Sequence, residues 1–251
     1  NVQSSTGRVM VVSQRAIILA DTGAPANGFT TADYQEIAAA FDTLVFPVDS
    51  ANFGNPTDID SNGRALIFFT QTVNAQTAPA SQFVLGGYFF ARDLFPITGA
   101  GACPGSNQGE MFYMPVVDVA SKYNGDFKDR AALKLNSIAT LAHEFQHLIN
   151  ASRRVYLTTA TAFEEVWLDE GLAHIAEELA YYRSSGLQPR ANLDASAILA
   201  TQVLKDAVNN YQVQNLARLS SYLKNPEANS PIDTNVTLAA RGAVWQFLRY
   251  A

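Results

Sequence analysis

The chain has 251 residues, of which 48% are hydrophobic and 16% are charged, and its formal net charge is -6. This composition is typical of a folded protein with a substantial core and excludes a disordered chain. The acidic balance gives no electrostatic reason to expect nucleic acid as a partner, and no apolar run approaches the roughly 18 residues needed for a membrane span.

The first part of the chain, up to about Phe127, reads as strands, turns and one helix. Residues 8–21 are rich in β-branched side chains and predict strands. Residues 30–46 begin with threonines suited to helix capping, and they predict a helix that ends at Pro47. Three further strands are predicted for short apolar runs bounded by Gly, Pro or Asn, at residues 64–73, 83–91 and 110–117.

From Lys128 onward the pattern is helical, with helices predicted over residues 129–152, 163–184, 194–208 and 214–226. A sheet-containing front and an all-helical back predict an α+β fold with two lobes. We interpret residues 1–251 as one domain. Its sheet-containing lobe is expected at 1–150 and its helical lobe at 151–251. The chain ends within an apolar periodic pattern, RGAVWQFLRYA, so we expect more chain after Ala251.

The stretch LAHEFQHLIN, residues 141–150, places two histidines four residues apart. On a helix, His143 and His147 would project from the same side and could bind one metal ion. Glu144 points about 100° around the helix, from where it could reach a metal-bound water without ligating the metal. Neutral imidazoles suit zinc, and a carboxylate can take a proton from the water that zinc acidifies.

The alternative is a structural helix with incidental histidines. A helical wheel favours the metal site, because the two histidines fall opposite the apolar face, where they would line a cleft or meet solvent. The apolar face, which we expect to be buried, consists of Leu135, Ile138, Leu141, Phe145, Leu148 and Ile149.

The next predicted helix offers a third ligand. Its apolar side carries Leu168, Leu172, Ile175, Leu179 and Tyr182, and its reverse side carries Glu170, His174 and Glu177. Catalytic zinc usually takes three protein ligands plus water, which favours Glu170 as the third ligand over a solvated carboxylate. His174, one turn further on the same side, could be the ligand instead.

These residues carry a resemblance to a known family. HEFQH followed by WLDEGLA resembles the glutamate-zincin metallopeptidases, and WLDEG is similar to a segment of the aminopeptidase N group. The combination with GLAHIAEEL looks closer to the hyicolysin-type neutral metallopeptidases of bacteria. The resemblance implies a zincin-like fold with an active-site cleft between the lobes. It implies His143, His147 and Glu170 as zinc ligands, Glu144 as general base, and His174 as a residue that orients a carboxylate or contacts substrate.

The resemblance further implies a secreted bacterial zinc peptidase that acts on proteins or peptides. Residues 1–10 lack the order of a signal peptide, so secretion rests on the resemblance alone. An endopeptidase is favoured because no motif for binding a free chain terminus is visible. Two alternatives stay open: a catalytically silent zincin-like binding domain, and a zinc hydrolase of a non-peptide bond.

Two parts of such a site are less well marked in the sequence. Arg241 could stabilise the oxyanion, as could Tyr181, Tyr211 or Tyr222. Residues 110–117, as the last strand before the histidine helix, are expected to form an edge strand that receives the substrate backbone.

A separate signal lies in DIDSNG, residues 58–63. Asp58, Asp60 and Asn62 are oxygen-bearing side chains at alternate positions before a glycine, as at the start of a calcium loop. The glutamate that closes an EF-hand would fall at Phe69, which excludes an EF-hand. The segment is either a Ca²⁺ site that borrows other ligands or a tight polar turn.

Overall fold

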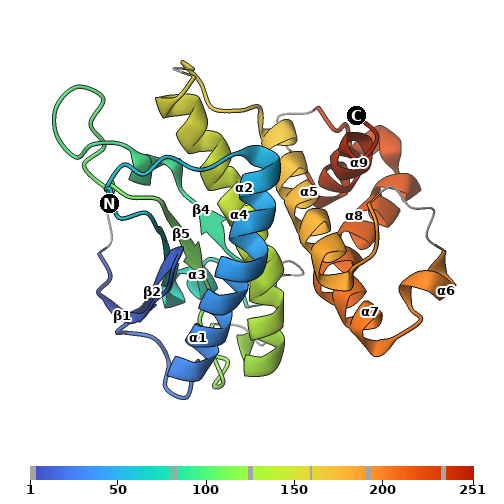
Figure 1. The fold of residues 1–251 in the computed structure, drawn as a ribbon, viewed down its shortest axis with the longest axis horizontal. Helices are drawn as coiled ribbons and strands as arrows, with labels where there is room; N and C mark the ends of the chain where they lie inside the picture. Colours follow the sequence, from blue (N-terminus) through green and yellow to red (C-terminus); the bar gives the residue numbers. More distant parts are fainter. Residues whose placement is uncertain are drawn as a thin grey trace.

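The computed structural model describes residues 4–79, 81, 84–123, 127–158, 160–189, 194–232 and 236–251. Its first half contains a five-stranded mixed sheet in which the strand order is β1-β2-β3-β5-β4 (Figure 1). The two outer pairs, β1 with β2 and β4 with β5, are antiparallel, whereas β2, β3 and β5 run parallel. The strands are β1 (Gly7–Val12), β2 (Ala16–Asp21), β3 (Ala65–Phe69), β4 (Tyr88–Phe89) and β5 (Met111–Met114).

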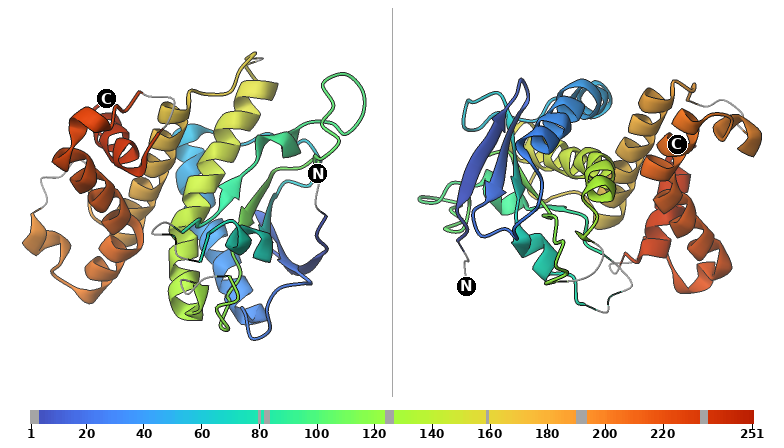
Figure 2. Two further views of the ribbon diagram at one scale, coloured as in Figure 1. Left: turned by 180° about the vertical axis from the view of Figure 1, so that it is seen from behind. Right: turned by 90° about the horizontal axis from the view of Figure 1, so that it is seen from below.

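Helices of the first half pack on this sheet, and the second half is helical in its described residues (Figures 1 and 2). The α+β architecture with two lobes is therefore confirmed. The long helix α4 continues past residue 150, where we expected the lobe boundary, to Tyr156. The helices before it are α1 (Thr31–Ala40), the π-helix η1 (Phe41–Val45), α2 (Phe46–Phe53), α3 (Gln71–Ala75) and η2 (Ala91–Leu94). From α4 onward they are α4 (Arg130–Tyr156), α5 (Val166–Ser185), α6 (Ala195–Ile198), α7 (Gln202–Ala207), η4 (Val208–Gln212), α8 (Val213–Lys224), η5 (Pro226–Ala228) and α9 (Leu238–Leu248).

The first helix begins where the sequence predicts it but does not end there. Thr30 caps α1 in a reciprocal capping box with Asp33, in which each side chain accepts a hydrogen bond from the other residue's backbone N–H. The predicted end at Pro47 is wrong, because η1 and α2 carry the helical chain on to Phe53. Pro47 falls in the first turn of α2, directly after the π-helix η1.

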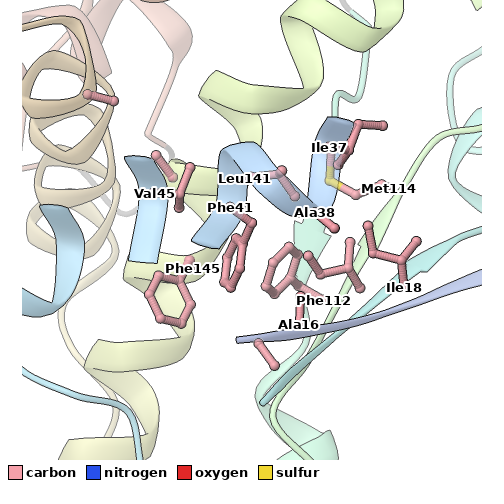
Figure 3. Close-up of a cluster of buried hydrophobic side chains, with 14 of the residues drawn as sticks. Ala16, Ile18, Ile37, Ala38, Phe41, Val45, Phe112, Met114, Leu141 and Phe145 are labelled. Carbon is pink, nitrogen blue, oxygen red and sulfur yellow. The ribbon is translucent and has the colours of Figure 1, made fainter. Parts of the chain in front are cut away.

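The core lies between the sheet and the helices η1 and α4 (Figure 3). Phe41 of η1 packs edge-on against Phe145 of α4, with ring centroids 5.0 Å apart. Leu141 of α4 and Phe112 of β5 are also fully buried in this cluster. These contacts fix α4 over the sheet and so determine which of its sides remains for the histidines.

The predicted burial is wrong for one residue on the apolar face of α4. Leu135 is 47% exposed, whereas Leu133 is buried beside Val117 and Phe127. The first turns of α4 bury their apolar contacts against the segment that leads into the helix, which turns Leu135 outward.

Several element boundaries also differ from expectation. The strand predicted at 64–73 ends at Phe69, because Thr70 caps the short helix α3. The strand predicted at 83–91 is reduced to Tyr88–Phe89, and residue 83 lies outside the described residues. The helix predicted at 194–208 is broken after Ile198 and resumes at Gln202. None of the helices within the described ranges is long and apolar enough to cross a membrane.

Candidate metal centre

Helices α4 and α5 lie side by side and bring the two sequence motifs together (Figures 1 and 2). Asp129 caps the start of α4 by accepting hydrogen bonds from the N–H groups of Ala131 and Ala132. Gly186, in the left-handed conformation at φ 72°, ends α5. The side of α4 that bears the histidines faces α5.

Three side-chain atoms converge between the helices as the sequence predicts. The carboxylate oxygen Oε2 of Glu170 lies 3.4 Å from Nε2 of His143 and 3.9 Å from Nε2 of His147. All three residues offer a ligand atom within 4.8 Å of the others. Two imidazole nitrogens and one carboxylate oxygen are a donor set that suits zinc.

A carboxylate oxygen lies close to the other nitrogen of each ring. Nδ1 of His143 lies 2.8 Å from Oε1 of Glu177, and Nδ1 of His147 lies 2.8 Å from Oδ2 of Asp169. Asn150 donates a 2.6 Å hydrogen bond to the second oxygen of Asp169. Carboxylate partners of this kind orient metal-binding histidines, and here they leave both Nε2 atoms directed toward Glu170.

The charges of the site favour a bound cation. Burial lowers the pKa of His143, but its contacts with Glu170 and Glu177 outweigh burial and raise that pKa to about 10. Burial alone would raise the pKa of Glu170. The hydrogen bond from His143 and the charges of both histidines and Arg241 instead hold it well below its usual range. A metal ion would take the place of the imidazole proton that this cluster otherwise retains.

A second group of potential ligands shares His143. It combines His143 with His174 and Glu177, and all three residues are buried. His174 is fully buried, which lowers its pKa to about 4, and its Nδ1 lies 3.2 Å from Glu177. Because a catalytic metal needs an open coordination position, this enclosed group is the weaker candidate.

Glu177 and His174 are part of a buried network that reaches α8. Oε2 of Glu177 accepts a 2.8 Å hydrogen bond from Asn215 and lies 3.9 Å from the guanidinium of Arg218. Sequence reasoning missed both α8 residues, and it assigned no role to Glu177 or Asp169. The only sequence signal for the two carboxylates was their position on the helix that carries Glu170.

The burial of α5 is the reverse of what its pattern predicts. The apolar side, which includes Leu172 and Ile175, is only half-buried, whereas His174 and Glu177 are buried against α4. The polar groups can be buried because they bind one another, as the preceding distances show.

Glu144 lies beside the three candidate ligands and contacts β4. Its Oε2 accepts a 2.7 Å hydrogen bond from the backbone N–H of Phe89, and burial raises its pKa. The expectation that residues 110–117 form the edge strand is wrong. β5 lies inside the sheet between β3 and β4, and the two-residue strand β4 is the edge next to α4.

Glycine allows the chain before β4 to lie against α4. A Cβ at Gly87 would lie 2.9 Å from Cγ2 of Thr140 and 3.0 Å from the carbonyl oxygen of Tyr113. No larger residue fits between these groups without a shift. The close approach brings Phe89 within hydrogen-bonding distance of Glu144.

Arg241 of α9 also reaches the cluster, where its Nη1 lies 2.6 Å from Oε2 of Glu170. The other candidates for its role lie elsewhere. Tyr181 and Tyr211 are buried in the hydrophobic core, and Tyr222 is half-buried on α8.

Glycines beside Glu170 and Arg241 permit this contact. A Cβ at Gly171 would lie 2.3 Å from Cγ1 of Val244, and a Cβ at Gly242 would lie 2.3 Å from the backbone N of Leu219. The close packing of α9 on α5 and α8 thus places Arg241 over Glu170.

The residues predicted for calcium are not part of this cluster. Asp58, Asp60 and Asn62 lie in the loop between α2 and β3.

Comparison with known proteins finds a similarity to a metalloprotease. No protein-family model matches the chain. The chain is 31% identical over 153 residues to the neutral metalloprotease ShpI of Staphylococcus hyicus. The aligned segment covers 61% of this chain and 32% of that protein, so the chain matches about a third of the relative's length.

Proposed function

We propose that this protein is a zinc-dependent peptidase. His143, His147 and Glu170 would hold the zinc, and Glu144 would act as general base. The observation that carries the proposal is the convergence of three ligand atoms, with a carboxylate oxygen 2.8 Å from Nδ1 of each histidine. The similarity to a neutral metalloprotease supports the same conclusion.

Bound zinc supplies two things, a lowered pKa for a coordinated water and polarisation of a substrate carbonyl. Glu144 takes a proton from the attacking water and passes it to the leaving amine. The Phe89 N–H holds the carboxylate of Glu144 in place for this transfer. Glu177 and Asp169 keep the two imidazoles in the orientation that binds metal.

Arg241 is the group we assign to the developing oxyanion. Its guanidinium contacts Glu170 and is 27% exposed, so it is fixed at the site and still accessible to a substrate. A cation positioned in advance stabilises negative charge in the transition state without reorganising at the moment of reaction.

The substrates we propose are proteins or peptides, cleaved at internal bonds outside the cell. β4 forms the edge of the sheet, and the N–H of its residue Phe89 points to Glu144. An extended peptide that added to this edge would run past the general base. We favour endopeptidase action because the sequence shows no motif for binding a free chain terminus, and secretion follows from the resemblance to secreted bacterial enzymes.

Digestion of casein tests the proposal. The unmodified protein should cleave casein, lose that activity to a zinc chelator and regain it when zinc is restored. Glu144→Gln should lower the rate by at least about 100-fold, because general acid–base catalysis is worth about 10²–10⁴-fold. Glu227→Gln, which changes an exposed carboxylate on η5, is the matched control and should leave the rate unchanged.

Each failure of this experiment has a meaning. Zinc-loaded protein without any hydrolysis would favour a silent binding domain. Hydrolysis of esters without hydrolysis of casein would favour a non-peptide substrate. Full activity in Glu144→Gln would refute the role of the base.

A further inference from the structure

Three acidic side chains meet where the parallel strands β3 and β5 begin, at the loop between α2 and β3. Asp58 and Asp60 lie in this loop, and Glu110 directly precedes β5. Because β3 and β5 are parallel neighbours, Glu110 lies beside the end of the loop, and its carbonyl oxygen accepts a hydrogen bond from Leu66 N. Asp58 and Glu110, which are 52 positions apart in the chain, thereby line one pocket, whose volume is about 230 Å³.

The carboxylate of Glu110 is the observation that points to a ligand. The residue is only 2% exposed. Its Oε1 accepts hydrogen bonds from Ile59 N at 2.9 Å and from Thr57 Oγ1 at 3.1 Å. Its Oε2 is also buried but accepts no hydrogen bond. A buried carboxylate oxygen without a partner is costly, and the carboxylate of Glu110 lies close to those of two aspartates.

The three acidic groups are close enough to share an ion. Asp58, Asp60 and Glu110 each offer one oxygen, and these oxygens lie within 4.8 Å of one another. Arg15 and Arg64 also line the pocket, but their guanidinium groups are engaged elsewhere. Arg15 stacks on Phe46, and Arg64 donates to the carbonyl oxygens of Ser13 and Asn62. Within the described part of the chain, no cationic side chain forms an ion pair with the three carboxylates.

We propose that Asp58, Asp60 and Glu110 bind a calcium ion. Calcium takes six to eight oxygen ligands in flexible geometry, whereas magnesium demands a near-ideal octahedron and zinc prefers nitrogen and sulfur. Three carboxylates from two separate segments, beside a pocket with room for water, fit calcium best. The site goes beyond the proposed peptidase function and does not depend on it.

Asn62, which the sequence pattern includes, has another role. Its Nδ2 donates to Asp60 at 2.6 Å, and its Oδ1 accepts from Arg64 N at 2.7 Å. The side chain of Asn62 therefore shapes the loop. Asp58 and Asp60 accept hydrogen bonds within the loop as well, from Gly63 N and from Asn62, but an ionised carboxylate keeps further lone pairs for an ion. Glu110 replaces it as the third ligand, and no spacing rule could have found a residue so distant in the sequence.

Calcium at this site would stabilise the loop on α4. Thr57 N donates to Oγ of Ser152, and Arg153 of α4 donates to the carbonyl oxygen of Asn55. An ion that binds the folded protein and not the unfolded chain raises the unfolding temperature by mass action.

Thermal unfolding in a calcium titration tests the proposal. The full chain is freed of divalent cations on a chelating resin, and zinc is then restored and held constant. Calcium chloride at about a hundred times Kd should raise the unfolding midpoint by roughly 5–10 °C, and isothermal titration should give one calcium per chain. Magnesium chloride at the same concentrations should give a smaller rise.

Three variants locate the ion. Glu110→Gln keeps an oxygen to accept from Ile59 and Thr57, so it should fold. It should lose the calcium-dependent rise, while its midpoint without calcium equals or exceeds that of the unmodified protein because repulsion is removed. Asp58→Asn should lose the rise too. Asp206→Asn, an exposed aspartate on α7 that bonds Gln202, is the control and should keep it.

The proposal is overturned by any of three results. The unmodified protein shows no rise with calcium, magnesium gives an equal rise, or both Glu110→Gln and Asp58→Asn keep the full rise.

Discussion

Replacing Gly171 with alanine should destabilise the protein, although alanine is the better helix former. Gly171 follows Glu170 on α5, at the point where α9 crosses. The new Cβ would lie 2.3 Å from Cγ1 of Val244 and 2.7 Å from Cδ1 of Leu248. Ordinary contact begins at 3.4 Å, so the Val244 methyl group would have to retreat by about 1.1 Å. Val244 is only 1% exposed, which leaves it little room to do so.

The expected change in the free energy of unfolding follows from two opposed effects. Overpacking in a core costs about 1–3 kcal/mol, and replacing glycine by alanine within a helix gains about 1 kcal/mol. Because two side chains must move, we expect a net loss of about 1–2 kcal/mol. For a chain of this length that corresponds to a fall of about 2–8 °C in the unfolding midpoint.

A double-mutant cycle with Val244→Ala identifies the cause. In the Val244→Ala background the closer of the two clashing groups is gone and only Cδ1 of Leu248 must move, so the loss caused by Gly171→Ala should be smaller there. Scanning calorimetry on the four proteins measures the coupling. Equal losses in both backgrounds, or a Gly171→Ala protein that is more stable than the parent, would refute the packing argument.

Two further predictions concern buried carboxylates. Glu177→Gln should weaken zinc affinity by about 10–100-fold, because the amide holds His143 less well than the carboxylate does. The adjacent variant Glu178→Gln should leave zinc affinity unchanged. Competition with a zinc-binding dye measures both affinities. Burial alone would raise the pKa of Asp33, but the hydrogen bonds from Lys134 and Thr30 outweigh burial and lower that pKa from 3.8 to about 2. Asp33 therefore contributes stability above about pH 4 that is lost as the pH falls toward 2. The stability difference between Asp33→Asn and the parent, measured by urea unfolding, should therefore shrink from pH 5 to pH 2; a constant difference would contradict this.

The parts of the site that sequence could predict are those set by helical periodicity. The spacing of His143 and His147 places both rings on one side of α4, and the structure brings Glu170 to them. The N-cap at Thr30 and the two-lobed α+β fold follow from equally local signals, namely side-chain chemistry and the order of the elements.

The parts that sequence could not predict depend on contacts between distant segments. Glu177 is paired with Asn215 on another helix, so a rule that turns polar stripes outward gives the wrong burial for α5. Strand order is a tertiary property as well. β5 is interior because β4, which precedes it in the chain, adds to its far side. The end of the first helix could not be predicted, because the π-helix η1 joins α1 to α2 and no residue of η1 is a sequence signal for a π-helix.

The zinc content of three purified proteins tests the central claim most directly. Elemental analysis should find one zinc per chain in the unmodified protein and in Glu144→Gln, because Glu144 is a base and not a ligand. Glu170→Ala should lose most of its zinc, because it removes one of three ligands. A full zinc complement in Glu170→Ala, or no zinc in the unmodified protein, would contradict the assignment of this metal centre.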